Sequence, residues 1–199
     1  MGAKRVAIAW LLTATVTGLA GCGSDRPANG IPAALVRQAR PIGRGARFLP
    51  PAAGPVIGAC RRRLGRRFGV HVELFAANRV VLVAAGIGTR PPLRLSEGRI
   101  SGARCYGEIV TLDPTGVVLI RPGARLTVSD MFRAWGQPLS ERRLVSFPAR
   151  ADARVAVFVD GRRWVGPPGS VPLKRHAEIV LEVGPYVPPH SAYDFPPGS

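Results

Sequence analysis

Hydrophobic and polar positions along this chain predict short β-strands separated by turn-rich segments. Runs rich in Val, Ile, Leu and Phe, bounded by Gly, Pro, Asn or Asp, are typical of strands. Asp113-Pro114-Thr115-Gly116 and Asp160-Gly161 have strong turn chemistry, so each is expected to close a hairpin. The strands are expected at residues 70–75, 80–83, 108–112, 117–121, 154–159, 162–165 and 178–183, the first two forming a hairpin of their own.

One amphipathic segment predicts a helix from residue 128 to about residue 135. Thr127 and Asp130 have the spacing of a capping box, in which each residue satisfies a free backbone group of the other. Gly136 suits the left-handed position that follows a last helical turn. We expect the apolar face of this helix, which includes Trp135, to pack on a sheet rather than to contact a ligand.

The first 22 residues have the layout of a bacterial lipoprotein signal peptide. Lys4 and Arg5 precede an apolar run, and Leu19-Ala20-Gly21-Cys22 has the small-residue pattern of a lipobox. We expect cleavage after residue 21 and attachment of palmitate-type acyl chains to Cys22. Such chains would hold the mature protein outside the cytoplasm, on the outer face of the bacterial cytoplasmic membrane. A transmembrane helix is the alternative, but the apolar run is shorter than the roughly 20 residues that a span needs.

Positive charge is concentrated next to the expected anchor. The chain has a formal net charge of +16, and residues 23–67 carry ten arginines and one acidic residue. Contact with the anionic membrane surface is expected to contribute at most about 1 kcal/mol per basic side chain. Nucleic acid is not an expected partner, because the protein is exported and its arginines are not interleaved with aromatic residues. The candidates for membrane-surface contact are Arg61, Arg62, Arg63, Arg66 and Arg67.

Two further cysteines, Cys60 and Cys105, remain once Cys22 is assigned to lipid. In an oxidising compartment two remaining cysteines most simply form a disulfide. The bridge would close a loop of about 46 residues and contribute about 4 kcal/mol to stability. Two free buried thiols are the alternative.

From Glu108 onward the element order is strand, strand, capped helix, strand, strand, strand, which looks like the β-grasp (ubiquitin-like) arrangement. Local sequences resemble its small sulfur-carrier members at residues 121–123, 127–132, 155–161, 171–173 and 178–181. This resemblance implies a fold and not a function. Sulfur carriers act through a free C-terminal Gly-Gly, whereas here Val183-Gly184 continues into Pro185, so carrier chemistry is not expected.

Residues 83–88, 135–139, 183–185 and 195–198 resemble an uncharacterised group of actinobacterial exported proteins and lipoproteins, over nearly all of residues 60–199. That group has His-rich strands, with an H-x-H-x-H-L run and an H-T-H-D run after a Cys. Here His71 alone remains of the first run, and Thr111 and Asp113 remain of the second. If those histidines bind a metal, this chain has lost most of the site.

His71 and Glu73 share one face of a strand, because strand side chains alternate between faces. With Asp113, or with Glu108 if its strand is a neighbour, they are candidate ligands for a transition metal. A packed or solvent-facing His71 without a metal is the alternative. No catalytic residue is expected, since the sequence has no G-x-S-x-G elbow, no H-E-x-x-H and no phosphate-cradling loop.

The sequence therefore predicts an α+β, strand-dominated fold, with a β-grasp-like sheet, one helix and an additional N-terminal β-hairpin. Residues 1–21 are expected to be the signal peptide, 22–59 a disordered, lipid-anchored tether rich in Pro, Gly and Arg, and 60–199 one extracytoplasmic domain. The aromatic residues of its Pro-rich tail, Tyr186, Tyr193 and Phe195, are expected to hold that tail against the domain. The expected function is non-enzymatic binding of an envelope protein or cell-wall partner, without a cofactor. The alternative is an envelope protein that handles copper or zinc, or a relative that has lost its metal.

Overall fold

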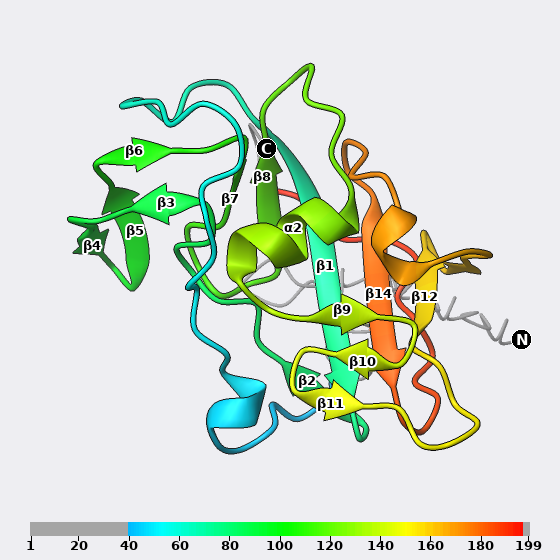
Figure 1. Ribbon diagram of the computed structural model, residues 1–199. Coiled ribbons are helices and arrows are strands. Elements are labelled where there is room, and N and C mark those ends of the chain that lie inside the picture. The colour runs from blue at the N-terminus through cyan, green and yellow to red at the C-terminus, as the bar shows by residue number, and fades with distance from the viewer. Residues whose placement is uncertain (1–39, 197–199) are drawn as a thin grey trace, which may run out of the picture. The chain divides into compact units, whose positions relative to one another are not determined.

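The structure is a computed structural model that describes residues 40–196. Their centre is a seven-stranded mixed sheet in the order β13-β12-β14-β1-β8-β7, with β2 paired to β1 (Figure 1). β1 and β14 are parallel, and the other pairs are antiparallel. The strands are β1 (Phe68–Ala76), β2 (Arg79–Val81), β7 (Ile109–Val110), β8 (Val117–Ile120), β12 (Ala156–Val159), β13 (Arg162–Arg163) and β14 (Glu178–Val183).

Short strands outside this sheet form three small ladders. β3 (Thr89–Arg90) pairs with β6 (Cys105–Tyr106), and β4 (Arg94–Ser96) pairs with β5 (Arg99–Gly102). β9 (Leu139–Ser140), β10 (Arg143–Leu144) and β11 (Phe147–Pro148) form the third ladder. Two 3₁₀ turns, η1 (Ala46–Phe48) and η2 (Pro168–Ser170), complete the regular structure that is described.

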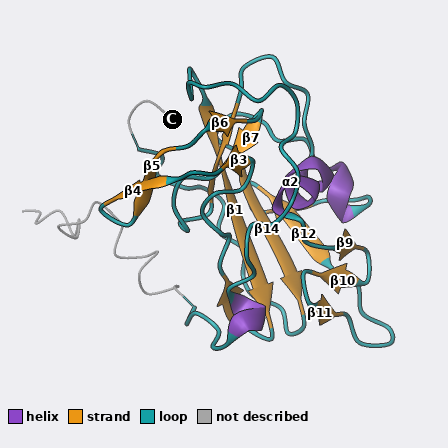
Figure 2. Ribbon diagram, turned by 60° about the vertical axis from the view of Figure 1, so that its left-hand side comes forward, coloured by secondary structure: helices purple, strands orange, loops and turns teal. Residues whose placement is uncertain are grey.

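Helix α2 (Val128–Trp135) has the bounds and caps that the sequence predicts. The backbone N–H of Thr127 donates to the Asp130 carboxylate at 2.9 Å, and Gly136 ends the helix with φ 78°. The helix lies on one face of the sheet, in front of β1 in Figure 1 and to one side of the strands in Figure 2. Trp135 is fully buried in the core there, so the prediction that this face packs on a sheet is confirmed.

Alternation along the central strands separates two faces. Val70, Val72 and Leu74 of β1 join the core under α2. His71 and Glu73 therefore point to the opposite face. β14 runs parallel to β1, with Glu178 opposite His71. Side chains of β14 therefore alternate between the same two faces of the sheet as those of β1. A residue that lies 107 positions away in the chain is thereby placed beside His71.

Within residues 40–196, these elements show the α+β, strand-dominated class with one α-helix. β1 lies at the centre of the sheet, so the hairpin it forms with β2 is part of the main sheet. The run expected at 108–112 forms only the two-residue edge strand β7. It ends early because the backbone of Thr111 pairs with the preceding connection: its N–H donates to the Ile87 carbonyl, and its carbonyl accepts from the Gly86 N–H.

Residues 40–59, which the sequence assigns to the tether, lie along the domain. The Gly43 N–H donates to the Val80 carbonyl and the Val80 N–H to the Pro41 carbonyl. Farther along, the Gly54 N–H donates to the Trp135 carbonyl. Proline prevents helix and sheet interiors but leaves the remaining backbone groups of a segment able to pair with neighbouring strands and loops. The packed part of the chain therefore begins well before Cys60.

Cys60 and Cys105 form the predicted disulfide, with their Cα atoms 5.3 Å apart. Arg61 pairs with Tyr106 next to it through two backbone hydrogen bonds. Together these links fasten the arginine-rich segment to β6. The expected signal peptide and lipid site at Cys22 lie outside the described residues, and none of the helices described is long and apolar enough to cross a bilayer.

Candidate functional site

Two neighbouring features lie on the sheet face opposite α2. One is a buried cluster of histidine and glutamate side chains on β1 and β14. The other is a pocket of about 530 Å³ lined by arginines and apolar residues. The C-terminal tail contributes to both, because Tyr193 stacks on His71 at 3.8 Å between ring centroids and also lines the pocket.

His71 is held by a hydrogen-bond partner at each ring nitrogen. Its Nδ1 lies 2.8 Å from Oε2 of Glu178, and its Nε2 lies 3.0 Å from the Thr115 carbonyl oxygen. Because a carbonyl oxygen only accepts, Nε2 carries a proton and donates it to Thr115. Gly116 makes this approach possible, since a Cβ there would lie 2.9 Å from Nε2 of His71. Nδ1 is thereby left as the nitrogen that faces the cluster.

Glu178 is the most deeply buried acidic side chain of the cluster, with 1% of its surface exposed. Burial raises the pKa of its carboxyl group, and the hydrogen bond and charge of His71 oppose that rise. Its Oε1 has no hydrogen-bond partner among the described residues. A buried carboxylate oxygen without a partner is costly, because it has lost its water and gained nothing in return.

Glu73 is held from the C-terminal tail. Nδ1 of His190 lies 2.8 Å from one carboxylate oxygen of Glu73 and 3.0 Å from the other. Tyr193 covers the neighbouring His71, and burial, together with nearby carboxylates led by Asp113, raises the pKa of the Tyr193 phenol. The tail therefore closes over the cluster with one imidazole and one neutral phenol.

One ligand atom each from His71, Glu73 and Glu178 lies within 4.8 Å of the others. This set of one imidazole and two carboxylates suits a divalent transition metal. The sequence identified His71 and Glu73 but missed Glu178 and gave no role to His190. Both come from distant parts of the chain, and only the strand register and the tail bring them here.

The other two acidic candidates lie elsewhere. Asp113 accepts a hydrogen bond from the Thr115 hydroxyl and lies 3.6 Å from Nε of Arg99, at the edge of the pocket. Glu108 lies between β6 and β7, with its side chain against Gly58. The structure therefore brings His71 and Glu73 together and leaves Asp113 and Glu108 outside the cluster.

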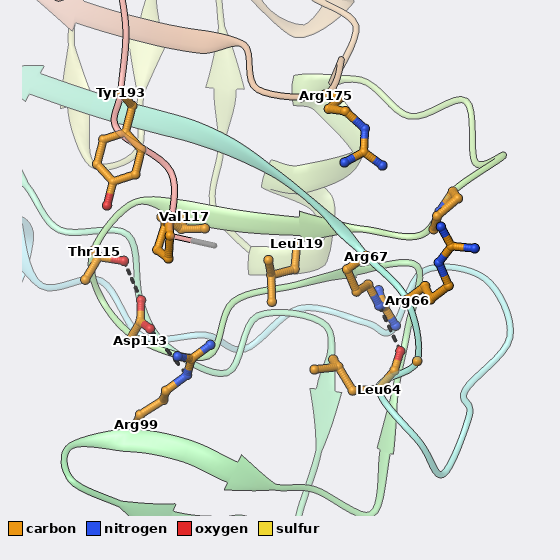
Figure 3. Close-up of a pocket in the computed structure, with 13 residues that line it drawn as sticks. Leu64, Arg66, Arg67, Arg99, Asp113, Thr115, Val117, Leu119, Arg175 and Tyr193 are labelled. Carbon is orange, nitrogen blue, oxygen red and sulfur yellow. Dashed lines mark hydrogen bonds and ion pairs between the residues drawn. The ribbon is translucent and has the colours of Figure 1, made fainter. Parts of the chain in front are cut away.

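Arginines from three segments line the pocket (Figure 3). Arg66 and Arg67 lie at one end and Arg99 at the other, with Arg175 near the first end. Val117 and Leu119 of β8 lie between the two ends. Asp113 is the one acidic side chain among the lining residues. The pocket thus combines excess positive charge with an apolar floor.

Arg67 is fixed as part of the pocket wall. Its guanidinium donates to the carbonyl oxygens of Leu64, Gly107 and Glu108 at 2.7–3.0 Å. Burial and the charge of Arg121 lower the pKa of Arg67 to about 10. By contrast Arg61, Arg62, Arg63 and Arg66 are exposed, as contact with a membrane surface would require.

Comparisons with protein-family models, with curated proteins and with solved structures found no match to this chain. The residues of the cluster and of the pocket are therefore what indicates a function for this chain.

Proposed function

We propose that this protein is a non-enzymatic binding protein of the bacterial envelope, anchored through acylated Cys22, whose domain binds a small anionic amphiphile in the arginine-lined pocket. The observation that carries the proposal is the charge of the pocket, which has four arginines and one carboxylate among its lining residues. A volume of about 530 Å³ is in the usual range for small-molecule sites.

The state of the arginines supports an anionic ligand. The positive charge of Arg67 is disfavoured by burial and by Arg121 and is only partly offset by the charge of Glu108, and its guanidinium donates to three backbone carbonyl oxygens. Arg99 is paired with Asp113 at 3.6 Å, but both side chains are partly exposed, so solvent screens that pair. A phosphate near Arg66 and Arg175, which lie toward the same end of the pocket, would gain charge-assisted hydrogen bonds, and its negative charge would offset the repulsion between Arg67 and Arg121.

The floor of the pocket supports an apolar portion of the ligand. Val117 and Leu119 line it between the arginines at its two ends, and Leu64 lies beside Arg67, as Figure 3 shows. An anionic head joined to an apolar group is the chemistry of membrane amphiphiles. A domain held at a membrane by a lipid anchor, with exposed Arg61, Arg62 and Arg63 just before the pocket residue Leu64 in the chain, would meet such molecules at high local concentration.

For the fold we propose a β-grasp arrangement. The support is the order of strands across the sheet, β8-β1-β14-β12-β13. If these five strands are numbered along the chain, that order reads 2-1-5-3-4. The first and last of them, β1 and β14, are parallel, and α2 lies in the chain between the second and the third. In this assignment β1 is the first strand, and β7 is an addition at the sheet edge. The assignment concerns architecture alone, since one fold serves many functions.

Binding of a short-chain anionic phospholipid tests the proposed function. We would titrate the full chain in nonionic detergent with dihexanoyl phosphatidylglycerol and, separately, with dihexanoyl phosphatidylcholine. We expect preference for the anionic lipid, and a loss of at least about 10-fold in affinity in Arg66→Gln/Arg175→Gln, because each charge-assisted contact contributes about 1.5–3 kcal/mol. Arg79→Gln, an exposed arginine outside the pocket, is the matched control.

Equal affinity for the two lipids would contradict the proposal. So would anionic-lipid binding that Arg79→Gln weakens as much as the pocket variant does, since surface charge would then explain the interaction without the pocket. Glycerol phosphate, which has the charged head and no acyl chains, is expected to bind more weakly than the short-chain lipid. Equal binding of the two would contradict the role given to the apolar floor.

A further inference from the structure

We propose that His71, Glu73 and Glu178 form a binding site for a divalent transition metal on the sheet face opposite α2. Their ligand atoms lie within 4.8 Å of one another, and His71 and Glu178 are more than nine-tenths buried. This site is separate from the arginine-lined pocket and does not depend on the binding of an anion there.

The orientation of His71 is that of a metal ligand. A histidine that binds a metal through one ring nitrogen typically donates its other N–H to a carbonyl or carboxylate, which fixes the tautomer. Here Nε2 of His71 donates to the Thr115 carbonyl at 3.0 Å, so Nδ1 is directed toward Glu178. An ion would take the position of the proton that Nδ1 and Glu178 now share.

The unpartnered oxygen of Glu178 is an independent indication of a ligand. Oε1 is buried and has no hydrogen-bond partner among the described residues, while Oε2 contacts His71 at 2.8 Å. Unsatisfied buried polar atoms are rare in native proteins and are commonly explained by a missing ion or water. A cation held by Glu178 would supply the partner that this oxygen lacks.

His190 is a positioning residue for Glu73. Its Nδ1 contacts both carboxylate oxygens of Glu73, at 2.8 and 3.0 Å. Ligating carboxylates are usually held by such outer hydrogen bonds, whose loss costs about 10–100-fold in metal affinity. The C-terminal tail would therefore tighten metal binding without itself supplying a ligand.

The charge of these ligands suits a dication. A dication bound by neutral His71 and by the carboxylates of Glu73 and Glu178 forms a site of zero net charge, which lowers the cost of burial. One nitrogen and two carboxylate ligands suit Zn²⁺, Co²⁺ or Mn²⁺ better than Cu⁺, which prefers sulfur.

Metal titration of the untagged full chain in detergent tests the site. We expect one Zn²⁺ per chain by calorimetry, and one Co²⁺ with the visible absorption of a protein-bound ion. Glu178→Gln and Glu73→Gln should each weaken Zn²⁺ binding by about 100-fold or more, and His190→Gln by about 10–100-fold. Glu182→Gln is the matched control, since Glu182 is a buried carboxylate on the same face of β14 outside the cluster.

Absence of stoichiometric Zn²⁺ and Co²⁺ binding would overturn the proposal. Binding that Glu178→Gln and Glu73→Gln leave unchanged would also overturn it, because the ion would then lie elsewhere. Glu73 is only partly buried, so its variant is expected to fold even if the Glu178 variant does not. A weakening by Glu182→Gln equal to that by Glu73→Gln would likewise refute a local site.

Discussion

Removal of the Cys60–Cys105 disulfide should destabilise the folded domain by about 4 kcal/mol. The bridge spans 45 positions of the chain. In the chain-entropy model a loop of this size lies between a 15-residue loop, at about 3 kcal/mol, and a 100-residue loop, at about 4.7 kcal/mol. The closed loop contains β1, β2, β3, β4 and β5. Loss of the disulfide therefore increases the conformational entropy of the unfolded chain over the segment that supplies the central strand.

The assay is urea unfolding of the full chain and of Cys60→Ser/Cys105→Ser, followed by circular dichroism. We expect a lower midpoint and a larger slope with urea, because the unlinked unfolded chain exposes more surface. The reduced wild-type chain is the control and should match the double variant. A loss below about 1 kcal/mol would refute the reasoning, since it would mean that residual structure already confines the unlinked unfolded chain.

Three further changes test the core, the helix cap and a buried carboxylate. Leu74→Ala should lower the free energy of unfolding in urea by about 2–5 kcal/mol, because Leu74 is fully buried. Leu95→Ala, at a position 71% exposed, should change it by less than about 0.5 kcal/mol. Similar losses for the two variants would contradict the packing described. Asp130→Ala removes the acceptor of the Thr127 N–H and should cost about 1 kcal/mol by the same assay, with a negligible loss counting against the cap. Burial raises the pKa of the Glu182 carboxyl above its usual 4.5, so the folded state retains a proton that the unfolded state releases. The free energy of unfolding should therefore fall as pH rises from about 4.5 through the raised pKa. Glu182→Gln should flatten that dependence in unfolding measurements at pH 4–8 with chelator present, and an unchanged slope would contradict the assignment.

Local sequence patterns predicted the elements whose cause is local. Thr127 and Asp130 satisfy each other within one helical turn, and Asp160-Gly161 adopts the left-handed angles that a two-residue hairpin needs, with φ 51° and 74°. The cysteine pair followed from counting the cysteines that remain after Cys22, on the expectation that the protein is in an oxidising compartment. These features depend on few neighbouring residues or on compartment chemistry, so one sequence was enough to find them.

The candidate site was only half visible in the sequence. His71 and Glu73 could be paired because strand side chains alternate. Glu178 could not be added, because nothing local states that β14 lies beside β1, in parallel and in this register. His190 looked isolated since it lies in a Pro-rich tail, and its contact with Glu73 depends on where that tail packs.

Taken alone, the sequence determined the fold class, the capped helix, the hairpin turns and the cysteine pair, because short-range backbone geometry and solvent chemistry decide these features. The tertiary structure decided that residues 40–59 pack on the domain, that β1 is central, and that arginines from three segments surround one pocket. It also placed Glu178 beside His71 across 107 positions of chain. Contacts of that kind depend on the register of strands paired across the fold, and a periodic pattern in one strand does not encode the register of its neighbour.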